Sequence, residues 1–246
     1  SDELGDETIL LADLFAYRLV DAHTGNVIDV KRALRDTFEL PMSLNIQGDK
    51  VVTTSWFTNA VEVYDRNNDQ ILTTYHDFKH PVDALIINDD ELLVAESGSG
   101  RLIVVSGKHG QKRRAILEDK PGLAALHPGS ENDTVYLTDV INGLLLEVDI
   151  DDGDIEIIAS GLDKPEGFDV AADGSIVLAE VGKQRIVRID PNTGQIDEIA
   201  RNLAIGLEPA QGTPAVYIQT GVAVSEAGNI YVTSDLNTAL YKITPN

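Results

Sequence analysis

Short stretches in which apolar and polar residues alternate follow one another along the chain, each bounded by turn-forming residues. This pattern is typical of β-strands with one buried face. Six of the stretches are copies of one another: residues 8–13, 50–55, 91–96, 134–139, 175–180 and 229–234. Successive copies end 41 to 43 residues apart, except for the last two, which end 54 residues apart. The chain is therefore built from a repeated unit.

A second strand follows each copy at a nearly constant distance. It ends ten residues later in five copies and eight residues later in the first: at Asp21, Asp65, Ser106, Asp149, Asp190 and Thr244. A turn comes next, as in Asp190-Pro-Asn-Thr-Gly194, where Asp can bond the turn backbone and Gly supplies a positive φ. With one strand before the copy and one after the turn, the unit is four short antiparallel strands. The best helical window, residues 29–38, lies in a connection.

Four strands in 40 to 45 residues, repeated six times, predict an all-β fold, a six-bladed β-propeller with four-stranded antiparallel blades. We expect one domain over residues 1–246, with blades at about 7–38, 39–78, 79–118, 119–160, 161–202 and 203–246. The first unit lacks the inner strand and the last lacks the outer strand. The terminal blades are therefore expected to be incomplete.

Composition narrows the possible partners. The chain has 41 acidic and 19 basic side chains, a net charge of −22, and no Cys. This charge disfavours nucleic acids and anionic membranes, which bind clustered Lys and Arg, and no apolar run is long enough to span a membrane. The sequence begins with Ser and has its only Met at position 42. We expect a processed chain, and the absence of Cys fits export to the periplasm or secretion.

Residues 162–190 resemble an NHL-type repeat, with Pro165-Glu166-Gly167-Phe168, then Asp173-Gly174-Ser-Ile-Val-Leu-Ala-Glu180, then an Arg-Ile strand. Residues 221–235 resemble the same repeat. The wider group includes the senescence-marker-protein and gluconolactonase family, which has the same six-bladed frame. The resemblance implies one divalent cation in the central channel, Ca²⁺, Zn²⁺ or Mn²⁺, that polarises a lactone carbonyl and activates water.

The resemblance also implies which residues would hold the cation. Glu166 stands in a Pro-Asn-Gly-like position, and Asp139, Glu180 and Asp235 lie at or beside ends of the repeated strand. Glu96 ends another copy. The early Glu-Gly-Pro signature of the family is absent. The predicted metal ligands are therefore Glu166, Asp139, Glu180, Asp235 and Glu96.

The carboxylates that end the repeated strand have two interpretations. Four of the six copies end in one: Asp13, Glu96, Asp139 and Glu180. Equivalent positions lie on one rim of the ring, so these residues could provide oxygen ligands for a hard cation. Alternatively, each could cap backbone N–H groups of its own hairpin. Repetition in several blades favours the capping role.

Glu166 and His80 are the predicted catalytic residues. Glu166 lies at the start of an inner strand, where the counterparts are Val82, Gly122 and Thr220, so we expect it to face the channel as ligand or general base. His80 precedes Pro81 at another inner-strand start, near the channel mouth. Asp83 and Asp169, further along their strands, are weaker candidates. His127 is placed at the far end of an inner strand, away from the mouth.

An irregular insertion, residues 203–219, accounts for the longer last interval. Insertions confined to one copy often carry the specific function, and the alternative is that this one only plugs one end of the channel. Trp56 and Phe57 lie in a hairpin on the same side as Glu96 and Glu180. They are a candidate binding patch, but packing onto a neighbouring blade is the favoured interpretation.

Two functions follow: a divalent-metal-dependent lactone or ester hydrolase, or a non-catalytic NHL-like module. The module would bind a small molecule, a peptide or a partner protein at one face of the ring. Neither hypothesis involves nucleic acid or membrane.

Overall fold

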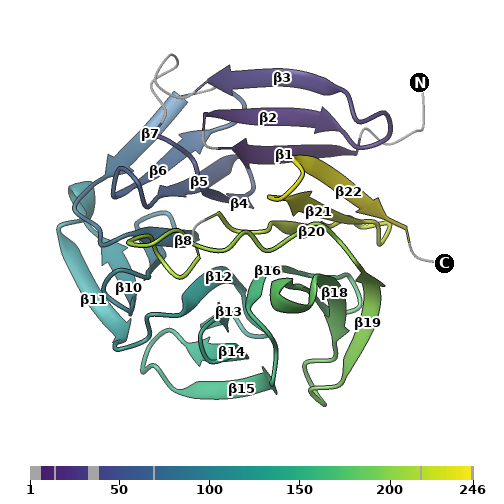
Figure 1. The fold of residues 1–246 in the computed structure, drawn as a ribbon. Helices are drawn as coiled ribbons and strands as arrows, with labels where there is room; N and C mark the ends of the chain where they lie inside the picture. The colour runs from purple at the N-terminus through teal and green to yellow at the C-terminus, as the bar shows by residue number, and fades with distance from the viewer. Residues whose placement is uncertain (1–6, 14, 33–38, 69, 217, 245–246) are drawn as a thin grey trace.

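The computed structural model describes residues 7–13, 15–32, 39–68, 70–216 and 218–244. In these residues, 22 strands form six antiparallel sheets of three, four, four, four, four and three strands, set around a common centre (Figure 1). The predicted all-β, six-bladed propeller with incomplete terminal blades is confirmed. Its described part contains two 3-10 turns, Lys108–Gly110 and Val181–Lys183, and no helix that could cross a membrane.

The first three blades contain eleven strands. Blade 1 is β1 (Thr8–Asp13), β2 (Ala16–Asp21) and β3 (Val27–Arg32). Blade 2 is β4 (Ser43–Gln47), β5 (Lys50–Ser55), β6 (Ala60–Asp65) and β7 (Gln70–Tyr75). Blade 3 is β8 (Pro81–Asn88), β9 (Glu91–Glu96), β10 (Arg101–Ser106) and β11 (Lys112–Leu117). Residues 29–32 of the best helical window, where we predicted no convincing helix, are strand, and residues 33–38 lie outside the described part.

The last three blades follow the same plan. Blade 4 is β12 (Leu123–Pro128), β13 (Thr134–Asp139), β14 (Leu144–Asp149) and β15 (Ile155–Ser160). Blade 5 is β16 (Pro165–Val170), β17 (Ile176–Glu180), β18 (Arg185–Ile189) and β19 (Ile196–Arg201). Blade 6 is β20 (Val222–Val224), β21 (Ile230–Ser234) and β22 (Ala239–Ile243).

The repeated turns form as their sequences predict. The carboxylate of Asp190 accepts the N–H of Asn192, and Gly194 closes the turn with a φ of 68°. Asp21 caps its turn in the same way, accepting the N–H groups of His23 and Thr24. Much of the acidic composition therefore serves the local geometry of the hairpins.

The hydrophobic core lies between neighbouring blades rather than within one sheet. Leu93 and Leu102 of blade 3, for example, belong to one buried cluster with Leu123 and Leu137 of blade 4. Because each sheet packs face to face against the next, the ends of equivalent strands are brought to the same rim. Residues at the rim are thus positioned by the core beneath them.

Blade 1 differs from the other blades at the centre of the ring. Its innermost strand, β1, matches the second strands of the other blades in sequence. In β5, β9 and β13 every residue after the first is buried, whereas in β1 only Ile9 is buried. Since the described residues place no strand inside β1, this strand itself borders the centre of the ring.

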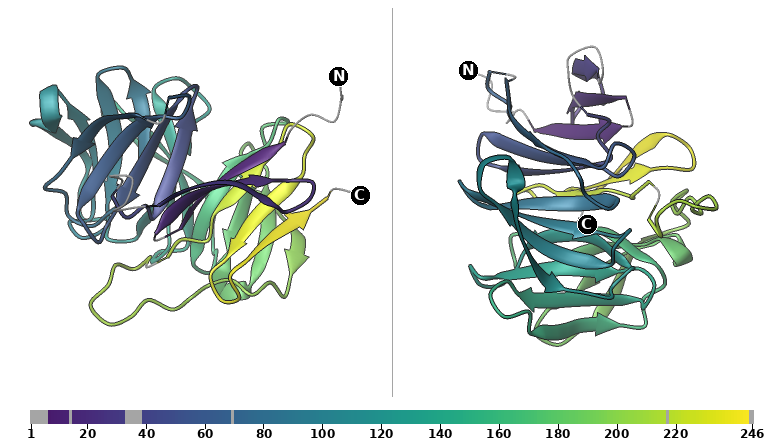
Figure 2. Two further views of the ribbon diagram at one scale, coloured as in Figure 1. Left: turned by 90° about the horizontal axis from the view of Figure 1, so that it is seen from above. Right: turned by 90° about the vertical axis from the view of Figure 1, so that its left-hand side faces the viewer.

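The insertion between β19 and β20 crosses the middle of one face of the ring, as Figure 1 shows, and Figure 2 gives the same ring from two other sides. Val216 is buried in a cluster with Ala124 and Val140, at the channel end of blade 4. The insertion therefore covers the channel on the face where the repeated strands end. We call this the insertion face.

Candidate functional site

The carboxylates that end the repeated strand bond groups of their own blades. Glu96 Oε1 accepts the N–H of Lys79 at 2.9 Å, and Glu180 Oε1 accepts the N–H of Asp163 at 2.9 Å. Both donors lie 17 residues before their acceptor, in the connection that enters the same blade. The second oxygen of each carboxylate binds an arginine, Arg101 or Arg185. These two side chains fix the entry of the chain into the blade.

Asp139 uses its carboxylate differently and caps its own hairpin. Its Oδ1 accepts the N–H groups of Ile141 and Asn142, and its Oδ2 accepts the side-chain amide of Asn142 at 2.8 Å. Asp235 does a related task for the insertion, because its carboxylate accepts the N–H groups of Gly206 at 3.0 Å and Leu207 at 2.6 Å. It anchors the segment that covers the channel.

These contacts bear on the predicted cation. The described residues contain no group of three or more His, Asp or Glu side chains placed to hold a metal ion. Glu96, Asp139, Glu180 and Asp235 are spread over four blades and direct their oxygens at protein donors. The structure does not bring the five predicted ligands into one coordination sphere, and we derive no step through a cation.

Glu166 has a different environment. It is 6 % exposed, and its Oε2 accepts the N–H of Thr220, at the end of the insertion, at 2.7 Å. Its Oε1 has no hydrogen-bond partner among the described residues. Burial raises the pKa of Glu166 to about 7, although the Thr220 hydrogen bonds lower it in part. Glu166 is therefore a buried carboxyl group with one oxygen available, as its singular position in the repeat suggested.

A pocket of about 450 Å³ lies against Glu166 on the insertion face; we call it the insertion pocket. Apolar side chains of two hairpins and of the insertion form its walls, among them Ile141, Leu162 and Leu207. Lys164 and Glu208 form an ion pair that joins blade 5 to the insertion across this pocket. The arrangement can enclose a small molecule and present one carboxyl group to it.

His80 does not line the insertion pocket. Its backbone has a φ of 50°, and its N–H donates to the Asn59 side chain at 3.1 Å. The ring packs edge-on against Trp56, with 6.2 Å between centroids. Trp56 in turn packs edge-on against Phe57, which is 63 % exposed. The structure thus separates the two predicted catalytic residues, and His80 has a packing role.

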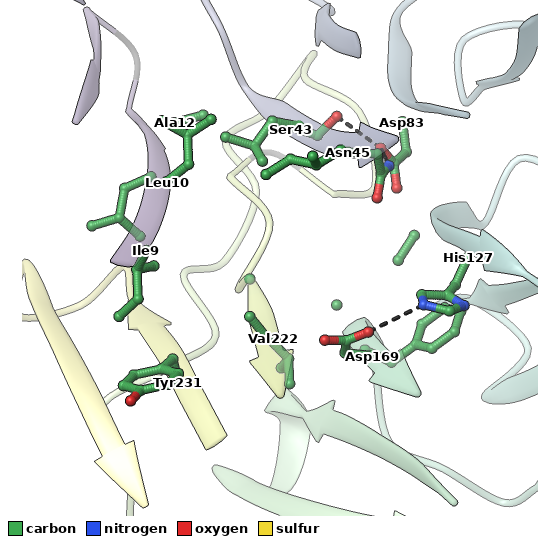
Figure 3. Close-up of a pocket in the computed structure, with 18 of the residues that line it drawn as sticks. Ile9, Leu10, Ala12, Ser43, Asn45, Asp83, His127, Asp169, Val222 and Tyr231 are labelled. Carbon is green, nitrogen blue, oxygen red and sulfur yellow. Dashed lines mark hydrogen bonds and ion pairs between the residues drawn. The ribbon is translucent and has the colours of Figure 1, made fainter. Parts of the chain in front are cut away.

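A cavity of about 500 Å³ lies at the centre of the ring and is lined by β1 and by the inner strands; we call it the central cavity (Figure 3). Asp83, His127 and Asp169 line it. Asp83 is buried and accepts hydrogen bonds from Ser43, Asn45 and the N–H groups of Ala84 and Leu126. Desolvation raises the pKa of Asp83 to about 6, against the lowering effect of these donors.

His127 and Asp169 form an ion pair across adjacent inner strands, with Nε2 to Oδ1 at 3.1 Å (Figure 3). The other ring nitrogen, Nδ1, lies 2.8 Å from the Pro128 carbonyl, so both nitrogens face oxygen acceptors. Burial alone would lower the pKa of His127, but the bonds to Asp169 and Pro128 raise it. A proton on each nitrogen would satisfy both acceptors, so this environment favours the charged form of His127.

Our sequence-based predictions assigned little or no weight to Asp83, His127 and Asp169, for a physical reason. Strand alternation predicts which side chains face the channel only when the register is regular. The pairings of β8, β12 and β16 with their neighbours each contain a register shift near the strand start. The sequence feature that could have identified this cavity is the presence of one charged or titratable residue on each of three inner strands, β8, β12 and β16.

No family model and no curated protein matches the sequence. Solved structures match over most of the chain. A virginiamycin B lyase from Staphylococcus aureus is similar with a TM-score of 0.64 at 16 % identity, covering 98 % of this chain and 82 % of the lyase. A chain of a nidogen/laminin complex gives 0.72 at 15 % identity, covering 97 % and 93 %. A luciferin-regenerating enzyme gives 0.63 at 12 % identity, covering 86 % and 75 %. At these identities the likeness shows the six-bladed propeller fold alone.

Proposed function

We propose that the protein binds a small molecule in the insertion pocket and that Glu166 exchanges a proton with it. One observation carries this proposal: the Glu166 carboxyl is almost fully buried, yet only one of its oxygens has a partner, and the residue lines a pocket. The oxygen without a protein partner is not among the fully buried atoms, so it is accessible from the pocket, and a carboxyl oxygen accessible in a pocket is a candidate contact for a ligand.

The reaction that fits this carboxyl best is hydrolysis of an ester or lactone. Glu166 as carboxylate takes a proton from water, whose oxygen attacks the carbonyl carbon. The protonated Glu166 then gives the proton to the departing alkoxide oxygen, so that acid and alcohol are formed and Glu166 is regenerated. A pKa of about 7 suits both steps at neutral pH. Lys164, on the same pocket wall, supplies positive charge for the developing oxyanion.

A panel of lactones and aryl esters tests the proposal, with Glu166→Gln as the variant and the exposed Glu156→Gln as its control. We expect at least a hundredfold lower kcat in Glu166→Gln, because Gln keeps the Thr220 bond but cannot transfer a proton. Glu156→Gln should match the wild type, and kcat should show an inflection near pH 7. No turnover by the wild type, or equal turnover by both variants, would contradict the catalytic role.

A second candidate is a non-catalytic binding module that uses the same face. Four turns that follow the repeated strand each expose a large apolar side chain: Phe15, Phe57, Ile141 and Leu236, between 45 % and 65 % exposed. Equivalent turns lie on one rim of a propeller, so these residues surround the insertion. Several exposed apolar groups on one face suit a protein partner.

Mutations distinguish the hydrolase function from the binding-module function. A Phe57→Ser, Leu236→Ser double variant should lose a specific cross-linked partner in cell extract and leave ester turnover within twofold. Glu166→Gln should do the reverse. If the double variant captures the same partner as the wild type, the apolar rim is not its binding surface.

A further inference from the structure

The central cavity is separate from the insertion pocket and opens on the opposite face of the ring. It is bordered by the start of β1 and by the far ends of the inner strands, including Gln47, Ile86 and Pro128. On the other side, the insertion and the bond between Glu166 and Thr220 lie between the two pockets. A ligand of the central cavity would therefore not meet the Glu166 carboxyl.

The shape of the central cavity follows from the incomplete first blade. Residues 7–12 all border it, although alternate strand residues point to opposite faces. The inner edge of β1, rather than one of its faces, is thus turned to the cavity. Figure 3 shows Ile9, Leu10 and Ala12 across the cavity from His127 and Asp169. One wall is the unpaired backbone edge of β1 together with apolar side chains such as Ile9 and Leu10, and the other wall carries the charged groups.

The charges of the cavity have one dominant sign. Its lining includes Glu7, Asp83 and Asp169 against the single cation His127, and no Lys or Arg among the residues described. The positive charge of His127 is already paired with Asp169. Asp169 is 24 % exposed in its side chain, so its carboxylate can accept a further donor from the cavity. The low dielectric constant of the cavity walls strengthens the negative electrostatic potential of the carboxylates.

We propose that the central cavity binds a small organic cation with an apolar body. The ammonium or guanidinium group would lie against Asp169, and the apolar part against the side chains of β1 and Val222. Anions are disfavoured by the three carboxylates and by the net charge of −22. Neutral apolar molecules would leave the remaining acceptor sites of Asp169 unused.

Isothermal titration calorimetry with three probes of similar shape tests whether the cavity selects a positive charge. The probes are the cation phenethylamine, the neutral 3-phenylpropanol and the anion 3-phenylpropionate. We expect phenethylamine to bind at least tenfold more tightly than either other probe. Binding of phenethylamine should weaken at least tenfold in Asp169→Asn and stay within twofold in the exposed Asp89→Asn. Equal binding of the three probes, or no binding of the amine, would overturn the proposal.

Asp169 also accepts the N–H of Val224, so Asp169→Asn could disturb the fold. Two variants that place opposite charges at Ile46 avoid this difficulty, because Ile46 lines the cavity and is 45 % exposed. We expect Ile46→Lys to weaken amine binding at least tenfold and Ile46→Glu to preserve or tighten it. If both variants weaken binding equally, the side chain matters through packing and the cavity does not select charge. Glu166→Gln should leave amine binding unchanged, which separates this proposal from the one on the insertion pocket.

Discussion

The carboxylates at the rim and the carboxyl of Glu166 lie within one face of the same ring, yet they meet opposite environments. Glu96 and Glu180 recur at equivalent places, and both oxygens of each are bonded to the protein. Glu166 occurs once, and one of its oxygens is left over. The difference teaches that a carboxylate repeated from blade to blade serves the blade, whereas one that interrupts the repeat is available for a ligand.

The strongest test of this comparison is removal of a repeated carboxylate. Glu180→Ala leaves Lys183, Arg185 and the N–H of Asp163 without their shared acceptor, which is fully buried. We expect a loss of about 3–4 kcal/mol in the free energy of unfolding and roughly 10 °C in Tm. Urea denaturation measures the loss, with exposed Glu156→Ala as a control within about 0.5 kcal/mol. A loss under 1 kcal/mol would mean that Glu180 is not a structural anchor.

Glu166 should behave in the opposite way, in a manner that depends on pH. Its pKa rises from 4.5 to about 7 on folding, so the folded state binds more protons between these values and its stability falls as pH rises through them. Glu166→Gln keeps the Thr220 bond and removes the buried charge. We expect it to match the wild type near pH 4.5 and to exceed it by about 2–3 kcal/mol at pH 8.

Unfolding curves at pH 4.5, 6 and 8 would follow this difference. A variant that is less stable than the wild type at pH 8 would show that the Glu166 charge is compensated by a group that the described contacts do not include.

Asp139 provides a smaller effect because its bonds are local. Asp139→Asn keeps one acceptor oxygen for Ile141 and Asn142 but turns an amide toward the Asn142 side chain. We expect a loss of about 1 kcal/mol, read from the shift of the urea midpoint at constant slope. A loss as large as that for Glu180→Ala would indicate a role beyond its own hairpin.

Chelation gives the smallest expected effect. Since the rim carboxylates bond protein donors, we expect 5 mM EDTA to change Tm by less than about 1 °C, measured by scanning calorimetry. A fall of several degrees that is reversed by Ca²⁺, Zn²⁺ or Mn²⁺ would restore the family-derived cation, because a ligand that binds the folded state raises Tm by mass action.

The β-repeat made the fold predictable. Turn residues such as Asp190 and Gly194 act within five positions of one another, and the spacing of the repeated strand counts the blades directly. The same local logic identified the capping role of Asp139. His80 precedes an inner strand as its sequence position predicted, but whether it shares a pocket with Glu166 depends on how two different blades are set around the ring.

By itself, then, the sequence determined the strands, the six blades and their shortened ends, and it singled out Glu166 as an exception to the repeat. These features rest on contacts between residues close in the chain, or on a period that the chain repeats. Only the tertiary structure decided that the rim carboxylates accept hydrogen bonds from protein donors and that the insertion covers the channel. It alone brought Asp83, His127 and Asp169 to one cavity, because they come from three inner strands whose register shifts hide which way each side chain points.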